Sequence, residues 1–75
     1  MKKQHEKVNR ELSPDKGGIY NVSMNGQELY KAEVIDYKKG ACWAILMVLN
    51  PGEGFNDMYK TGDTFQIKVA HYEFK

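Results

Sequence analysis

Nine consecutive apolar residues, ACWAILMVL at positions 41–49, constrain the fold of this chain more than any other feature of its sequence. The run lies between two turn sequences, YKKG and NPGEG, and is too short for a comfortable helix. A strand that is buried on both faces has this continuous apolar pattern. We therefore predict the central strand of a small, strongly curved sheet, with one face in the interior and the other covered by the N-terminal arm, a loop or a partner. A buried helix is the alternative, because Ala, Leu and Met favour helices.

The length of the chain limits how this strand can be stabilised. A domain of 75 residues removes only about 60% of its unfolded surface from water. Small domains often compensate with disulfides or a metal, but this chain has one cysteine and no Cys/His cluster at metal-ligand spacing. The sheet must therefore be stabilised by its own apolar core and by association.

Turn signals divide the rest of the sequence into short strands. IYNVSM runs into Asn25–Gly26, a dipeptide that readily adopts the positive φ angles of a type I′ turn, and QELYKAEVIDY follows, which predicts a β-hairpin. The segment FNDMYK at 55–60 has room for one helical turn at most. In TFQIKVAHYEF the apolar alternation shifts by one position from Ala70 onward, so we expect a β-bulge or a sharp bend there.

These patterns predict a mostly β fold, namely a small antiparallel barrel or rolled sheet of the OB or SH3-like type, with about five short strands. We expect the barrel domain to span 17–75. Residues 1–16 contain Val8 and Leu12 four positions apart and then the turn sequence SPDKGG. We expect these residues to form a mobile arm or a loosely docked short helix.

Part of the sequence resembles a known family. AEVIDYKKGACWAIL, followed by GEGFNDMYKTGDTFQIKV, resembles the layout of S1-type RNA-binding OB domains over roughly residues 32–69. In both, a strand leads through a glycine turn to an apolar strand, and a later GD opens an alternating strand. The chain has Cys42 where the family has an aromatic residue, and FNDM where the family has a histidine. The resemblance implies an OB-like fold and, as an expectation, RNA binding.

Charge and hydropathy restrict the function classes. The chain has 11 basic and 10 acidic residues, and the basic excess lies in residues 1–16. A near-neutral body argues against strong nucleic-acid binding, which depends on lysine and arginine. No apolar segment reaches the roughly 18 residues of a membrane span, and the first residues lack the apolar region of a secretory signal. We therefore expect a cytoplasmic protein without a membrane partner.

The sequence gives little support for catalysis. A reactive Cys42–His71 pair would need an exposed thiol, and we expect Cys42 to be a small buried hydrophobe within the apolar run. His5 lies in the arm, and neither histidine has a partner at metal-ligand spacing. We expect no catalytic residue, no metal site and no cofactor.

Surface binding remains as the expected function. Four methionines, one tryptophan and five tyrosines are residue types typical of protein interfaces. We expect a binding module that docks onto a partner protein, as an adaptor or an inhibitor, through an apolar or aromatic sheet face or an edge strand; the partner could be a second copy. The candidate contacts are Tyr20, Tyr30, Tyr37, Trp43 and Tyr59.

The alternative is weak binding of single-stranded nucleic acid, RNA above all. Trp43 would stack on bases while lysines hold the phosphate backbone. The candidate lysines are Lys31, Lys38 and Lys39.

Overall fold

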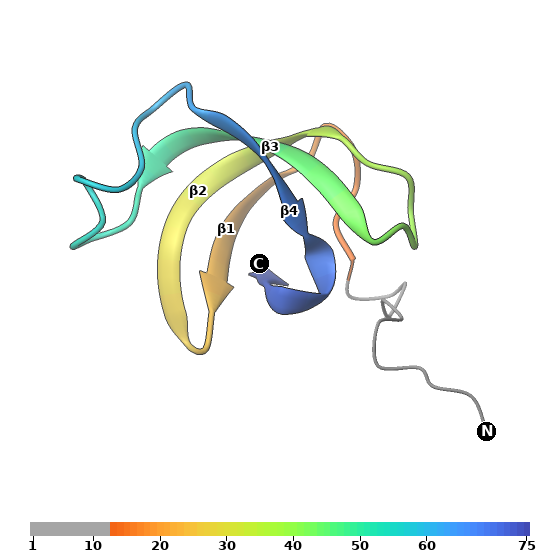
Figure 1. Ribbon diagram of the computed structural model, residues 1–75, viewed down its shortest axis with the longest axis horizontal. Coiled ribbons are helices and arrows are strands. Elements are labelled where there is room, and N and C mark those ends of the chain that lie inside the picture. Colours follow the sequence, from red (N-terminus) through yellow and green to blue (C-terminus); the bar gives the residue numbers. More distant parts are fainter. Residues whose placement is uncertain (1–12) are drawn as a thin grey trace.

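The computed structural model describes residues 13–75, which form a single antiparallel sheet (Figure 1). Its elements, in chain order, are β1 (Ile19–Met24), β2 (Gln27–Asp36), β3 (Trp43–Pro51), β4 (Thr64–Lys68), the 3₁₀ helix η1 (Val69–His71) and β5 (Glu73–Phe74). The strand order is β4-β3-β2-β1-β5. The predictions of a mostly β fold and of about five strands are confirmed, and the apolar run forms β3 rather than a helix. The prediction that this run is the central strand is wrong: β2 lies in the middle of the order, because β5 pairs with the far edge of β1. Of the arm predicted for residues 1–16, residues 1–12 lie outside the described residues.

The first hairpin has the predicted turn. Asn25 has φ 53° and Gly26 has φ 81°, and Met24 pairs with Gln27 on either side of them. Positive φ at both central positions defines a type I′ turn, whose twist matches that of the flanking strands.

Irregular pairing bends the sheet. Register shifts interrupt the β1–β2 pairing at Val22/Ser23 and the β2–β3 pairing at Lys31/Ala32 and Val34/Asp36. Bulges of this kind increase local twist and bend the strands. Figure 1 shows the result, an arched sheet with the C-terminal segment on its concave side. Because β4 and β5 are the two edges, the sheet is curled but not closed.

The core lies on the concave face. Leu46 and Val48 of β3 are fully buried, and Val22 and Val34 from the neighbouring strands are each 1% exposed. The remaining buried apolar side chains are Leu29, Tyr30, Ala32, Tyr37, Ala44, Ile67 and Val69. In β3 the core residues alternate with outward-facing ones, as a half-buried strand requires.

The shift of apolar alternation at Ala70 corresponds to the single helical turn η1. The sharp bend expected at Ala70 is present, but it is made by η1 rather than by a bulge, and Tyr72 N–H closes it on the carbonyl of Val69 at 3.1 Å. The chain leaves β3 there and pairs with the opposite edge, so that Phe74 lies beside Val22 of β1. The helical turn buries Val69 and redirects the chain from β3 to β1 at the opposite edge of the sheet. A bulge would bend the strand but leave it paired with β3.

The segment before β1 also packs on the body. Pro14 is fully buried, and Ser13 is 8% exposed. Gly17 N–H donates to the carbonyl of Val34 at 2.8 Å, and Gly18 accepts from Val34 N–H at 2.9 Å. The packed structure therefore includes residues 13–16, which the sequence pattern assigned to the arm.

Candidate functional site

The outward side of β3 is apolar and exposed. Along this strand Ala44, Leu46 and Val48 point into the core, so Trp43, Ile45 and Met47 alternate onto the convex side. Trp43 is 51% exposed and Ile45 is 37% exposed. The concave side of β3 is therefore covered by the core, whereas no part of residues 13–75 covers its apolar convex side.

Neighbouring strands extend this surface. Ile19 of β1 pairs with Glu33 of β2, which in turn pairs with Met47, so these three side chains form a row across the convex side. In the next row Asp36 pairs with Ile45, and Ile35 is the unpaired residue at the register shift between Val34 and Asp36. Ile19 is 54% exposed and Ile35 is 39% exposed. We call this surface the outer apolar face; its residues are Ile19, Ile35, Trp43, Ile45 and Met47.

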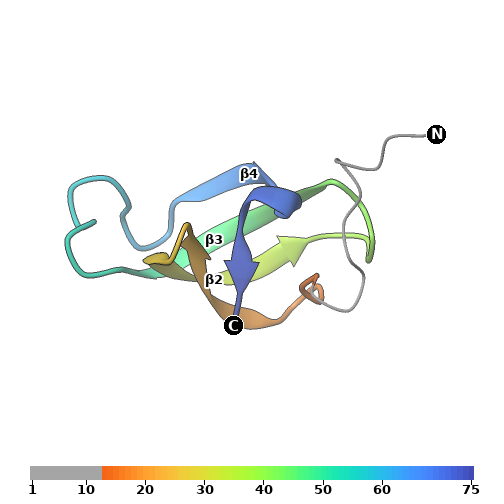
Figure 2. The same cartoon turned by 90° about the horizontal axis from the view of Figure 1, so that it is seen from below.

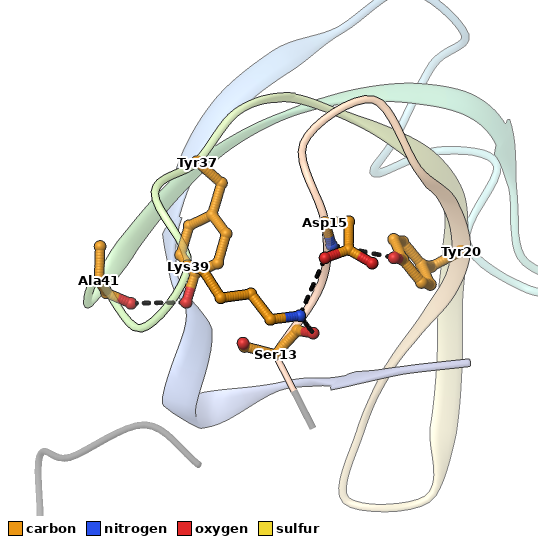
Figure 3. A network of polar contacts seen from close by, with 6 residues as sticks. All are labelled: Ser13, Asp15, Tyr20, Tyr37, Lys39 and Ala41. Carbon is orange, nitrogen blue, oxygen red and sulfur yellow. Dashed lines mark hydrogen bonds and ion pairs between the residues drawn. The ribbon is translucent and has the colours of Figure 1, made fainter. Parts of the chain in front are cut away.

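Of the five aromatic residues predicted as partner contacts, Trp43 alone belongs to this face. Tyr30 is 2% exposed and Tyr37 is 7% exposed, so both are core residues without surface for a partner. The Tyr37 hydroxyl donates to the carbonyl of Ala41 at 2.8 Å, which fixes the turn before β3 (Figure 3).

The two remaining tyrosines are half-buried. Tyr20 packs edge-on against Phe74, with ring centroids 5.9 Å apart, and its hydroxyl accepts a hydrogen bond from Asp15 N–H at 2.9 Å (Figure 3). Tyr59 packs against Tyr30, with ring centroids 4.7 Å apart. Both rings are committed to intramolecular packing on the concave side.

The sequence interpretation missed Ile19, Ile35, Ile45 and Met47. It selected aromatic residues by type and did not assign them to a side of the sheet. The strand phase would have separated them, because Ile45 and Met47 alternate with the small and branched residues that fill the core.

The concave aromatic cluster is structural. Phe65 stacks on Tyr30 at 5.7 Å and meets Tyr59 edge-on at 5.7 Å. Burial raises the pKa of Tyr30, and the neighbouring hydroxyls of Tyr72 and Tyr59 raise it further. Burial, followed by the effect of Tyr59, also raises the pKa of Tyr72. These phenols therefore stay protonated at neutral pH.

The lysines of the alternative hypothesis are dispersed. Lys39 Nζ lies 2.9 Å from Asp15 Oδ1 and donates to the carbonyl of Ser13 at 3.1 Å (Figure 3). Lys38 is exposed in the same turn, whereas Lys31 lies in β2 roughly 17 Å along the strand from its end at Asp36. The three lysines do not form a continuous strip with Trp43, and one of them is paired with a carboxylate.

The residues weighed for catalysis lie on the surface. Cys42 is exposed, so the prediction that it is buried is wrong: it precedes β3, in the turn region, where its carbonyl accepts from Val69 N–H at 2.8 Å. His71 is exposed at the end of η1. Within residues 13–75, no group of three or more His, Cys, Asp or Glu side chains is placed to hold a metal ion.

The structure defines a small single-sheet β domain with an exposed apolar convex face. The sequence matches no protein-family model, and comparison with curated proteins and with solved structures gives no match. Among the helices of residues 13–75, none has the length and apolar character needed to cross a membrane.

Proposed function

We propose that this protein is a non-enzymatic binding module that docks onto a partner protein, as an adaptor or an inhibitor, through the outer apolar face. The observation that carries the proposal is the grouping of five large apolar side chains on the convex side of three adjacent strands. Single exposed hydrophobic residues are normal on protein surfaces, whereas a contiguous group of them is typical of an interaction site.

The chemistry of the face supports a protein as the partner. Complete burial of a large aliphatic side chain contributes roughly 1.5–3 kcal/mol. Four residues of the face still have 37–54% of their surface exposed, namely Ile19, Ile35, Trp43 and Ile45. Tryptophan, here Trp43, is one of the residue types that most often contribute strongly to binding at protein interfaces. Glu33, half-buried between Ile19 and Met47, would orient a partner that offers it a hydrogen-bond donor or a positive charge.

We also infer that the curled sheet belongs to the small-barrel class, OB or SH3-like. The support is the bending at the register shifts and the return of β5 to the edge of β1 after the turn at η1.

The proposal is tested by placing a charge in the face. Ile45→Lys and, separately, Ile19→Lys should retain the fold, because both side chains point outward, and should weaken partner binding at least about ten-fold. Asn56→Lys adds the same charge on an exposed residue of the loop between β3 and β4 and should bind as the unmodified protein does. Immobilised proteins are incubated with nuclease-treated lysate, and the retained protein is identified, purified and titrated against all four forms.

Two outcomes would contradict this proposal. Equal affinity of the retained protein for Ile45→Lys, Ile19→Lys and Asn56→Lys would show that docking occurs elsewhere. If the protein retained from lysate is lost on nuclease treatment, RNA binding through Trp43 and the turn lysines becomes the supported function.

A further inference from the structure

We propose that the open edge of β4 pairs with β4 of a second copy of this chain, antiparallel and about a two-fold axis at Gln66. This interface uses an edge of the sheet, whereas the proposed function uses the convex side. Figure 2 shows β4 along the outer side of the sheet, with β3 and β2 following it.

The hydrogen-bonding direction of β4 follows from its pairing with β3. Val69 N–H donates to the carbonyl of Cys42, and Val48 N–H donates to the carbonyl of Asp63. Between these two bonds, at intervals of two residues, lie the pairs Ile67–Ala44 and Phe65–Leu46. Residues of an antiparallel strand direct their backbone groups alternately to either side. Phe65 and Ile67 therefore bond to β3.

Thr64 and Gln66 consequently direct their backbone N–H and C=O groups toward the open edge. Both residues are exposed. No strand of residues 13–75 pairs with this edge. An edge of this kind is a template for another strand.

The five residues of β4, TFQIK, are complementary to themselves in one register. With the two-fold axis at Gln66, the outward-facing side chains pair as Gln66 with Gln66 of the second copy and as Thr64 with Lys68 of the second copy. On the concave side, Phe65 faces Ile67 of the second copy at the close, non-hydrogen-bonded positions. Aromatic and β-branched residues in direct opposition stabilise a strand pair. The Phe65 ring is half-buried and still has surface to contribute.

Other registers about a two-fold axis are less favourable. An axis at Lys68 would place two lysines directly opposite each other, which destabilises a pair. An axis at Thr64 or at Phe65 would bring Asp63 of the second copy against Phe65 or Ile67. The register about Gln66 avoids both conflicts and uses all five residues of the strand.

The pairing would join two curled sheets into one continuous sheet. Ile45 pairs with Gln66 in each copy, so the central row on the convex side would read Ile45, Gln66, Gln66, Ile45. The two β3 strands would lie three strand spacings apart, roughly 14 Å. The two outer apolar faces would then share one side of the dimer.

Charge exchange at Gln66 tests the register directly. Sedimentation velocity of the full chain over a wide concentration range should show a monomer–dimer equilibrium. Gln66→Lys and Gln66→Glu should each weaken dimerisation at least about ten-fold, because like charges would meet at the axis. An equimolar mixture of the two variants should restore the dimer, since opposite charges then meet.

A proline at the same position tests the backbone contribution. Gln66→Pro removes an N–H that points to the open edge and leaves the donors of Phe65 and Ile67 to β3 in place. It should be monomeric with an unchanged far-UV circular dichroism spectrum, whereas Gln66→Thr, which keeps the N–H, should dimerise.

Several results would overturn the edge pairing. These are a monomeric protein at every concentration, a dimer unaffected by either charge, or a charge mixture that stays monomeric. Ile19→Lys separates this proposal from the proposed function. Ile19 lies three strands from β4, so its substitution should weaken partner docking without changing dimerisation.

Discussion

Gly52 lies directly against the backbone of β2. Its N–H donates to the carbonyl of Leu29 at 2.7 Å, and a Cβ at this position would overlap the Glu28 carbonyl and lie 2.8 Å from the Leu29 carbonyl oxygen. The obstruction is backbone, which cannot rotate away as a side chain can. The requirement for glycine at this position is therefore steric.

Gly52→Ala should lower the free energy of unfolding by roughly 1–3 kcal/mol, as overpacking does elsewhere. Glu53→Ala, at the exposed neighbouring position, should change it by less than about 0.5 kcal/mol. Urea unfolding followed by tryptophan fluorescence measures both. Equal stability of Gly52→Ala and the unmodified protein would mean that the end of β3 moves freely relative to β2.

The raised pKa of Tyr30 predicts that the folded protein loses stability at alkaline pH. Its pKa in the folded protein is raised above the ordinary value of 10.0, chiefly by burial. Below pH 10 both the folded and the unfolded states hold the phenolic proton, so the group leaves stability unchanged. Above pH 10 the unfolded chain releases the proton while the folded protein keeps it, so the free energy of unfolding falls as pH rises.

Tyr30→Phe should reduce this alkaline loss, which for one group reaches at most about 1.4 kcal/mol per pH unit. Denaturant unfolding at a series of pH values from neutral to strongly alkaline compares the two proteins. Parallel stability curves above pH 10 would show that Tyr30 does not control the transition.

At the scale of elements, a single lysine connects the segment before β1 to the turn before β3. Lys39 contacts both the carboxylate of Asp15 and the carbonyl of Ser13, across 24 and 26 positions of sequence. The ion pair is largely exposed, with side chains 40% and 72% exposed, so its contribution is small.

Lys39→Met should lower the free energy of unfolding by at most about 1 kcal/mol and should increase proteolysis near residues 13–16. Lys38→Met, at the exposed neighbouring position, is the matched control and should behave as the unmodified protein. Identical proteolysis of the two variants would indicate that the burial of Pro14 and the backbone hydrogen bonds to Val34 hold the segment without Lys39.

Local signals predicted the elements well. The turn at Asn25–Gly26, a strand in the apolar run 41–49 and the bend at Ala70 follow from φ preferences, run length and a phase shift, all of which act over a few residues. The observed strand is displaced by two residues, to Trp43–Pro51. The bend became η1 rather than a bulge because the following residues pair with β1, a contact between distant parts of the chain.

At the scale of the whole molecule, one layer of sheet encloses the core and leaves its convex side uncovered by residues 13–75. A domain this small buries a limited share of its surface, so the proposed association would add to its stability by mass action. The convex side offers apolar area and the β4 edge offers backbone hydrogen bonds. These are two different interactions, and the substitutions at Ile19 and Gln66 separate them.

The amino-acid sequence by itself determined the β character, the first hairpin, the apolar strand β3 and the position of the last bend, because these depend on neighbouring residues. The tertiary structure alone decided which side of the sheet each side chain occupies. It buried Tyr30 and Tyr37, exposed Cys42 and grouped Ile19 and Ile35 with Trp43. The reason is that strand order and register shifts, set by packing between distant segments, determine which residues become neighbours on a curved sheet.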